Sequence, residues 1–334
     1  MKMPLDEVLI AIALSAYTLG ALALLVYFFS REPWLRNFGA PLAILGCVAQ
    51  FVQLIVRFET THVWPLLNLY GSLSLFAAMS VAIYIGFAFR YDLWFAGGFV
   101  LALAAVFLAY GITWYEGTMP PVPSLQSYWA KIHVPIVVSS YAAFLVAFVF
   151  SSIYLLKYYA ERSFEGRRVL AAVGGDLGPT VAAADFAVNP MMSSIAGSVG
   201  VDFSKGVLRD TPALVAAAQA GNPVARCLAA LPSLAQLDVI VYRAVAIGLP
   251  LISIGIITGA MWAKEAWGAY WQWDPKETAA LFSWIIYLAY MHLHTRHGWR
   301  GLRTNWVSVI GFLSIIFCYL GVNIWISGLH SYKV

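Results

Sequence analysis

The sequence predicts an all-α polytopic membrane protein with about eight transmembrane helices. Hydrophobic residues make up 61% of its 334 residues, charged residues make up only 11%, and the mean hydropathy is +0.77. Soluble domains carry about 25% charged residues, so this chain could not cover a surface that faces water on all sides. The composition therefore excludes an ordinary soluble enzyme, a disordered protein and a nucleic-acid-binding protein.

Eight segments are apolar over a length that suits a bilayer crossing, which requires roughly 20 mostly apolar residues. The first segment has no small-residue cleavage site before Arg31, so we interpret it as a membrane helix and not as a cleavable signal peptide. An even number of spans places both termini on the same side of the membrane. The spans are expected at about 6–29, 40–57, 69–89, 93–114, 133–157, 239–262, 278–294 and 306–328.

The apolar segments divide the chain into three parts. Residues 1–157 hold the first five spans, and residues 239–334 hold the last three together with a Trp-rich loop at 262–278. Residues 158–238, between them, combine basic residues with Gly- and Pro-containing stretches, which is typical of a segment outside the membrane. We expect this insertion to be helical around 211–219, loop-like elsewhere, and used for docking or spacing.

Basic residues are distributed unequally between the two sides of this topology. Fourteen of the 20 Lys and Arg residues fall on one side, including every Arg except Arg57. Because cytoplasmic loops are enriched in Lys and Arg, this side is predicted to face the cytoplasm. The 158–238 insertion is then cytoplasmic. Both termini and the Trp-rich loop lie on the outer, periplasmic side of the inner membrane, or of a thylakoid-type membrane in a photosynthetic cell.

Two histidines reach the outer surface together with the Trp-rich loop. His133 opens the fifth span, and His330 follows the eighth span near the C-terminus. Two imidazoles can supply both axial ligands of a haem iron, and indole rings offer a flat apolar surface for the porphyrin. The topology therefore favours a haem site at this surface. His62 and His297 lie in loops, and we interpret them as interfacial residues.

The Trp-rich loop contains more indoles than membrane anchoring requires. An interfacial anchor accounts for one or two tryptophans, whereas four stand close together here. We favour a ligand platform made of Trp267, Trp271 and Trp273, and we expect Trp262, which lies inside the sixth span, to tolerate exchange for Phe.

Two residues of the loop have predicted backbone roles. Gly268 is expected to allow another group to approach closely, because it has no Cβ. Asp274 is followed by Pro275 and then by Glu277 in the first turn, a pattern typical of a helix N-cap. We therefore expect Asp274 to begin the seventh span.

Several motifs together resemble the CcsA (ResC-type) subunit of the system II cytochrome c synthase, a family of haem-handling membrane proteins with a Trp-rich WWD signature. The signature alone is shared with system I proteins of the CcmC and CcmF type, whereas the other motifs favour the CcsA family. The signature is WGAYWQWDPKET, and the other motifs are PLLNLYGSL, LQSYWAKIHV, YMHLHTR and GVNIWISGLHSY.

The resemblance implies roles for particular histidines. His133 and His330 match the external haem ligands that act while haem is presented to the apocytochrome, and they are the implied catalytic residues. A further histidine is implied as a ligand of a membrane-embedded haem, and the family's YLHTR ending indicates His294, with His292 as the alternative. We find no partner for His294 at its depth in this chain, and the resemblance implies a CcsB (ResB)-type membrane subunit that supplies one.

The implied reaction attaches haem b covalently to the two cysteines of a CxxCH motif in apocytochrome c. The chain would be a holocytochrome c synthase (haem lyase) subunit that acts with its partner, and it carries no CxxCH of its own. His294 lies twenty residues beyond Asp274, about 30 Å along a helix, so two haem positions are required. The alternatives are a system I haem-handling protein and a membrane di-haem b-type electron-transfer protein.

Overall fold

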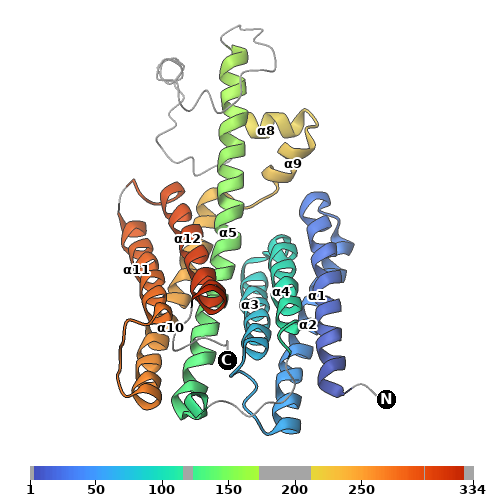
Figure 1. Cartoon of the computed structure of the whole chain (residues 1–334). Helices are drawn as coiled ribbons and strands as arrows, with labels where there is room; N and C mark the ends of the chain where they lie inside the picture. The colour runs from blue at the N-terminus through green and yellow to red at the C-terminus, as the bar shows by residue number, and fades with distance from the viewer. Residues whose placement is uncertain (1–3, 116–122, 173–211, 297, 327–334) are drawn as a thin grey trace.

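The computed structural model describes residues 4–115, 123–172, 212–296 and 298–326. Every regular element within these ranges is helical, as expected (Figure 1). The longer helices are α1 (Leu5–Ser30), α2 (Pro33–Thr61), α3 (Leu69–Tyr91), α4 (Gly97–Ile112), α5 (Tyr128–Ala172), α10 (Leu234–Trp267), α11 (Pro275–Thr295) and α12 (Leu302–Ile316). The shorter ones are α8 (Pro212–Gln219), α9 (Pro223–Ala229) and α13 (Val322–Trp325).

The predicted multi-span architecture is confirmed. Each of the eight expected spans corresponds to a helix or a short helical series, and seven of these are long and apolar enough to cross a membrane. Helix α11 occupies the expected seventh span but does not meet this criterion of length and apolarity. Its first turn carries Lys276 and Glu277 and its last turn carries His292 and His294, so its length includes polar residues at both ends.

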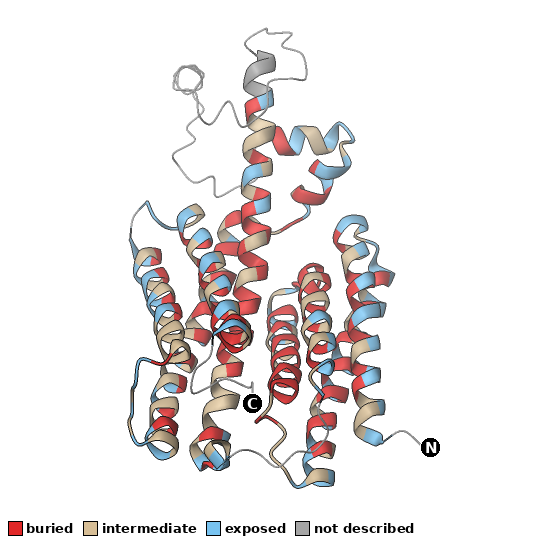
Figure 2. Cartoon of the chain, viewed as in Figure 1, coloured by how far each residue is buried: buried red, intermediate tan, exposed pale blue. Residues whose placement is uncertain are grey.

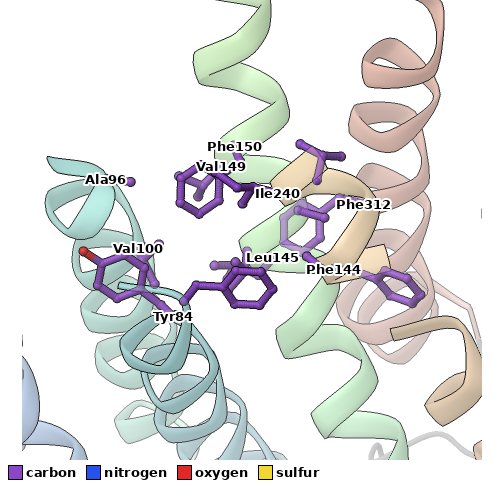
Figure 3. Packing of buried hydrophobic residues seen from close by; sticks show 14 of the residues in the cluster. Tyr84, Ala96, Val100, Phe144, Leu145, Val149, Phe150, Ile240 and Phe312 are labelled. Carbon is purple, nitrogen blue, oxygen red and sulfur yellow. The ribbon is translucent and has the colours of Figure 1, made fainter. Parts of the chain in front are cut away.

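Helix α5 lies between two groups of helices, α1–α4 on one side and α10–α12 on the other (Figure 1). Its buried face contributes large apolar side chains to the main core, including Phe144 and Phe150 (Figure 3). The ring of Phe144 stacks on Tyr287 of α11, with centroids 3.6 Å apart and planes inclined by 9°. Buried residues concentrate along the facing sides of these helices (Figure 2), so both groups are packed onto one central helix.

Residues 158–172, expected to be a loop, instead continue α5. This helix has 45 residues, about 68 Å at 1.5 Å per residue, and thus extends well beyond a bilayer core of about 30 Å. Its upper part stands above the other long helices, with α8 and α9 beside it (Figure 1). The helix expected near 211–219 is confirmed as α8.

A buried lysine attaches this upper region to the membrane bundle. The ammonium of Lys157 donates hydrogen bonds to the carbonyl oxygens of Leu231 and Pro232, at 3.1 and 3.0 Å, and lies 3.8 Å from the carboxylate of Glu161. Because a buried cation is stable only with such partners, these contacts hold the connection between α9 and α10 against α5.

Candidate functional site

The N-terminal end of α5 and the C-terminal end of α10 lie together at the lower end of the bundle, and the Trp-rich loop rises from there to the start of α11 (Figure 1). Two hydrogen bonds join the first two of these segments. The hydroxyl of Ser127 donates to Oε2 of Glu265 at 2.8 Å, and the indole N–H of Trp262 donates to the carbonyl of Ser124 at 2.7 Å. His133 and the Trp-rich loop are therefore brought to one end, as the topology predicted.

The imidazole of His133 has a defined tautomer. Its Nδ1 lies 2.8 Å from the carbonyl oxygen of Gly255 on α10. A carbonyl oxygen only accepts hydrogen bonds, so Nδ1 carries the proton, and in the neutral ring the lone pair is then on Nε2. Metal-ligating histidines typically donate their second ring N–H to a carbonyl or carboxylate in this way. The arrangement suits a ligand that binds through Nε2.

Glycines on α10 make room for this ring. A Cβ at Gly259 would lie 2.8 Å from Cε1 and 3.0 Å from Nδ1 of His133, closer than side chains pack. A Cβ at Gly255 would lie 2.5 Å from Cγ2 of Val137, one turn further along α5. Sequence reasoning missed both glycines. Their spacing of four residues on an apolar span indicates close packing of helices, but it does not identify His133 as the residue that packs there.

Trp262 is a structural neighbour of His133 and not a peripheral anchor. Its side chain is only 6% exposed and packs with Leu67 and Ala130. Its indole lies against the imidazole of His133, with centroids 5.7 Å apart. The sixth span continues as α10 to Trp267 and places Trp262 beside His133 of α5. This contact argues against the expectation that Trp262 tolerates exchange for Phe.

The remaining tryptophans differ in exposure. Trp267 packs on Trp262, with centroids 5.1 Å apart, and Trp271 meets Trp273 edge to face at 5.6 Å. Trp273 is 69% exposed and has a φ of 56°, a left-handed conformation that is uncommon for a bulky residue. Such an outlier points to a functional role where the surroundings enforce it. The loop thus presents aromatic surface outward at Trp273, beside the half-buried Trp271.

Glu277 holds the backbone of the loop. Its Oε2 accepts hydrogen bonds from the backbone N–H of Gln272 at 2.9 Å and of Asp274 at 3.2 Å. Asp274 is the N-cap of α11, as predicted: its Oδ2 accepts from the N–H of Lys276 at 3.0 Å, with Pro275 at the first helical position. This reciprocal capping satisfies N–H groups that a helix start leaves unpaired.

Gly268 has a backbone role in addition to the close approach that was expected of it. It is the C-cap of α10, with a φ of 84°, and its N–H donates to the carbonyl of Lys264. Among the described residues, no atom outside its immediate surroundings lies within 4 Å of a Cβ built at this position. The glycine is required because α10 ends in the left-handed conformation.

The end of α12 connects to the start of α11. Residues Phe317–Gly321 form a π-helical turn, and the following helix α13 carries Asn323. The ammonium of Lys276 donates to Oδ1 of Asn323 at 3.0 Å. His330, the second expected outer ligand, lies outside the described residues. The contact nonetheless ties the chain that precedes His330 to the Trp-rich loop.

The upper end of the bundle holds a second polar cluster, built around Asp238 of α10. Its Oδ2 lies 3.0 Å from Nε2 of His294 and accepts a hydrogen bond of 3.0 Å from Nε of Arg300. Its Oδ1 accepts from Nδ2 of Asn305, also at 3.0 Å. Asp238 is 3% exposed and His294 is 9% exposed. Asp238 is therefore a hydrogen-bond partner of His294 that the sequence did not reveal. The expected haem ligand opposite this histidine, from a CcsB-type subunit, stays a prediction.

His292 has the opposite environment on the same helix. It is exposed, and its Nε2 accepts a weak hydrogen bond of 3.4 Å from Nε of Arg296, one turn further along. Two residues along a helix rotate a side chain by about 200°, so His292 and His294 face different directions. His294 points into the protein and His292 points away from it.

A family model described as "Cytochrome C assembly protein" matches residues 66–330, which include both polar ends of the bundle and the Trp-rich loop. The chain belongs to the cytochrome c assembly protein family. The match covers well over half of the chain, and it confirms the family indicated by the sequence motifs.

Relatives that match over nearly their full length agree with this family and indicate its CcsA members. The cytochrome c biogenesis protein CcsA of Gloeobacter violaceus is 34% identical over 309 residues, covering 91% of this chain and 88% of the relative. CcsA of Mesostigma viride is 30% identical, covering 99% and 98%, and CcsA of Prochlorococcus marinus is 33% identical, covering 98% and 94%. The predicted role in cytochrome c biogenesis of the CcsA type is thereby confirmed.

A solved structure supports the fold. The structure of the cytochrome c heme lyase CcmF superposes with a TM-score of 0.58 at 14% identity, covering 96% of this chain and 47% of the CcmF chain. This chain therefore spans about half the length of that structure. At this identity the likeness shows a shared helical architecture.

Proposed function

We propose that this protein presents haem b on the outer side of the membrane for covalent attachment to a CxxCH motif of apocytochrome c. The observation that carries the proposal is the hydrogen bond from Nδ1 of His133 to the carbonyl of Gly255. It orients the ring and places the lone pair on Nε2, as an axial ligand of iron requires. Haem is the substrate in this reaction, and His330 is the second proposed ligand.

The tryptophans then contribute position and not acid–base chemistry. The exposed ring of Trp273 and the half-buried ring of Trp271 offer surface for the porphyrin, while Trp262 and Trp267 pack behind His133 and the loop. Holding the porphyrin in one orientation aligns its vinyl groups with the incoming cysteines, and fixed geometry of this kind accelerates bond formation. Glu277 and the cap at Asp274 keep the loop in shape.

For an inner, membrane-embedded haem we propose His292 as the ligand in place of His294, which the YLHTR ending had indicated. The Nε2 atom of His294 is engaged by the buried carboxylate of Asp238. His292 is exposed, so a second subunit can approach it. A CcsB (ResB)-type partner would supply the opposing ligand, and the assembly would act as a holocytochrome c synthase.

We propose further that the lower end of the bundle in Figure 1 faces the periplasm or thylakoid lumen and that the upper end faces the cytoplasm. The upper end carries Arg31, Arg36 and Arg300, whereas Arg57 lies at the lower end, where it pairs with Asp6 at 3.6 Å. Cytoplasmic loops are enriched in Arg and Lys. Haem would accordingly pass from the His292 end to the His133 end.

The test is cytochrome assembly with variants of the outer ligands. In cells that express the chain with its CcsB-type partner and a CxxCH reporter cytochrome, His133→Gly and His330→Gly should abolish covalent haem attachment. Added imidazole should partly restore it by occupying the axial position that the missing ring leaves. His62→Gly is a matched control, because His62 is an exposed histidine at the same end whose φ of 54° suits glycine. Unchanged assembly in both ligand variants would contradict the proposal.

A further inference from the structure

The Asp238 cluster joins three segments at the upper end of the bundle. Asp238 belongs to α10, and its carboxylate accepts from His294 of α11 and Asn305 of α12, both within 3.0 Å. Arg300, in the connection between α11 and α12, supplies a third contact at 3.0 Å. A buried carboxylate requires such partners, so the C-terminal end of α11 is fixed relative to two neighbouring helices.

The ring of His294 is restrained on its faces as well as at Nε2. It stacks on Tyr242 of α10, with centroids 4.6 Å apart and planes inclined by 26°, and on Tyr290 of α11 at 5.8 Å and 27°. Rotation of α11 about its axis would remove His294 from Tyr242 and from Asp238 together. The cluster therefore determines the rotation of this end of α11.

The rotation of α11 in turn decides where His292 points. His292 lies two residues before His294, about 200° around the helix, and it is exposed. Slippage of α11 by a single residue would turn His292 by about 100°, enough to remove it from any ligand it serves. Its contact with Arg296, at 3.4 Å, lies on the same helix and cannot prevent such a movement.

From this geometry we infer that Asp238 and His294 are positioning residues, which hold α11 so that His292 is directed towards the inner haem. The inference rests on the proposed role of His292. It also assigns different roles to the two histidines of the YMHLHTR motif: His294 forms a hydrogen bond with Asp238, and His292 coordinates the haem iron. Arg300 is 57% exposed in its side chain, so it is the member of the cluster that the cytoplasmic solution contacts.

A conservative substitution separates positioning from ligation. The amide nitrogen of a glutamine reaches about as far as Nε2 of histidine and can donate to Asp238, but an amide is a poor ligand for haem iron. His294→Gln should therefore keep the inner haem and its low-spin spectrum. His294→Ala and Asp238→Ala should each reduce bound inner haem severalfold or shift it to a high-spin spectrum. The double variant should lose less than the sum of the two single losses, because both substitutions remove the Asp238–His294 contact.

The measurement is the absorption spectrum and haem content per mole of purified complex with the CcsB-type partner, in a His133→Gly background that minimises the contribution of the outer position. Arg303→Gln is the matched control, because Arg303 is an exposed arginine at the same end that stacks on Trp299 at 4.8 Å and lies outside the cluster. Its spectrum should match that of the background.

Two results would overturn the inference, and they differ from failure of the proposed function. If His294→Gln loses the inner haem as completely as His294→Ala, while His292→Ala retains it, His294 is itself the ligand. If His292→Ala loses the haem but His294→Ala and Asp238→Ala leave haem content and spectrum unchanged, the positioning role is absent although the ligand assignment holds. Haem loss in none of the three variants would instead refute the proposed inner site.

Discussion

The indole of Trp262 lies against the imidazole of His133, with ring centroids 5.7 Å apart and planes inclined by 35°. The same indole donates a hydrogen bond of 2.7 Å to the carbonyl of Ser124, in the segment that leads into α5. One side chain of α10 therefore restrains both the ring that we propose as a haem ligand and the backbone that carries it.

Trp262→Phe should impair cytochrome assembly. Phenylalanine keeps an aromatic ring but loses the N–H donor, which leaves the Ser124 carbonyl without this bond at a cost of about 1 kcal/mol. We expect a severalfold loss of covalent haem in the reporter cytochrome at nearly normal protein level. Trp306→Phe is the comparison, because Trp306 is 43% exposed on α12. Equal tolerance of the two changes would indicate that Trp262 is only a packing residue.

Gly259→Ala should displace His133. The added methyl group would lie 2.8 Å from Cε1 of the ring, so the imidazole or α10 must shift. We expect less haem bound at the outer site and a change in the absorption bands that depend on His133. The fold should persist, because a shift of this kind costs only about 1–3 kcal/mol of folding stability. Gly86→Ala on α3 is the control, since nothing lies within 4 Å of a Cβ there. An unaltered spectrum in Gly259→Ala would show that the ring position is not critical.

Glu277→Ala should loosen the Trp-rich loop without unfolding the bundle. It removes the acceptor for the N–H groups of Gln272 and Asp274, and loss of such a cap costs about 1 kcal/mol. Faster proteolysis at residues 268–274 and weaker cytochrome assembly are expected. Glu277→Gln should behave nearly as the native chain, because the amide oxygen still accepts both bonds. If Gln and Ala act alike, the charge of Glu277 and not its capping matters.

Lys276→Met should weaken the connection between the loop and the chain segment before His330. The substitution keeps the apolar length of the side chain and removes the donor to Asn323. We expect Lys276→Met alone to reduce cytochrome assembly partly. Combined with His330→Gly, it should also make added imidazole less effective in restoring assembly, because the remaining groups of the site are less well placed. A Lys276→Met variant with native assembly would show that this connection is dispensable.

Reporter fusions test the proposed orientation. A fusion at residue 270 should report an external position and a fusion at residue 200 a cytoplasmic one, because Arg residues concentrate at the end that carries residue 300. The opposite pattern would reverse the direction of haem movement and require a different order of the two sites.

The sequence by itself determined the class, the spans and the residues of the Trp-rich loop. Long apolar segments have few alternatives to helices in a bilayer, because backbone groups must be satisfied within the segment. For this reason all eight expected segments correspond to helices, and the Asp274–Pro275 start of α11 was predictable from local capping rules. The family could also be identified, because its motifs are short and contiguous in the chain.

The tertiary structure alone decided which side chains meet. His294 and Asp238 are 56 residues apart, and His133 and Gly255 are 122 residues apart, so no local periodicity connects them. Membrane helices of similar apolarity can pack in many rotations, since lipid and protein interiors are equally apolar. Close packing at Gly255 and Gly259 and the buried Asp238 carboxylate select one rotation. That selection assigns His133 a defined tautomer, brings Trp262 into the site, and turns His292 and His294 in opposite directions.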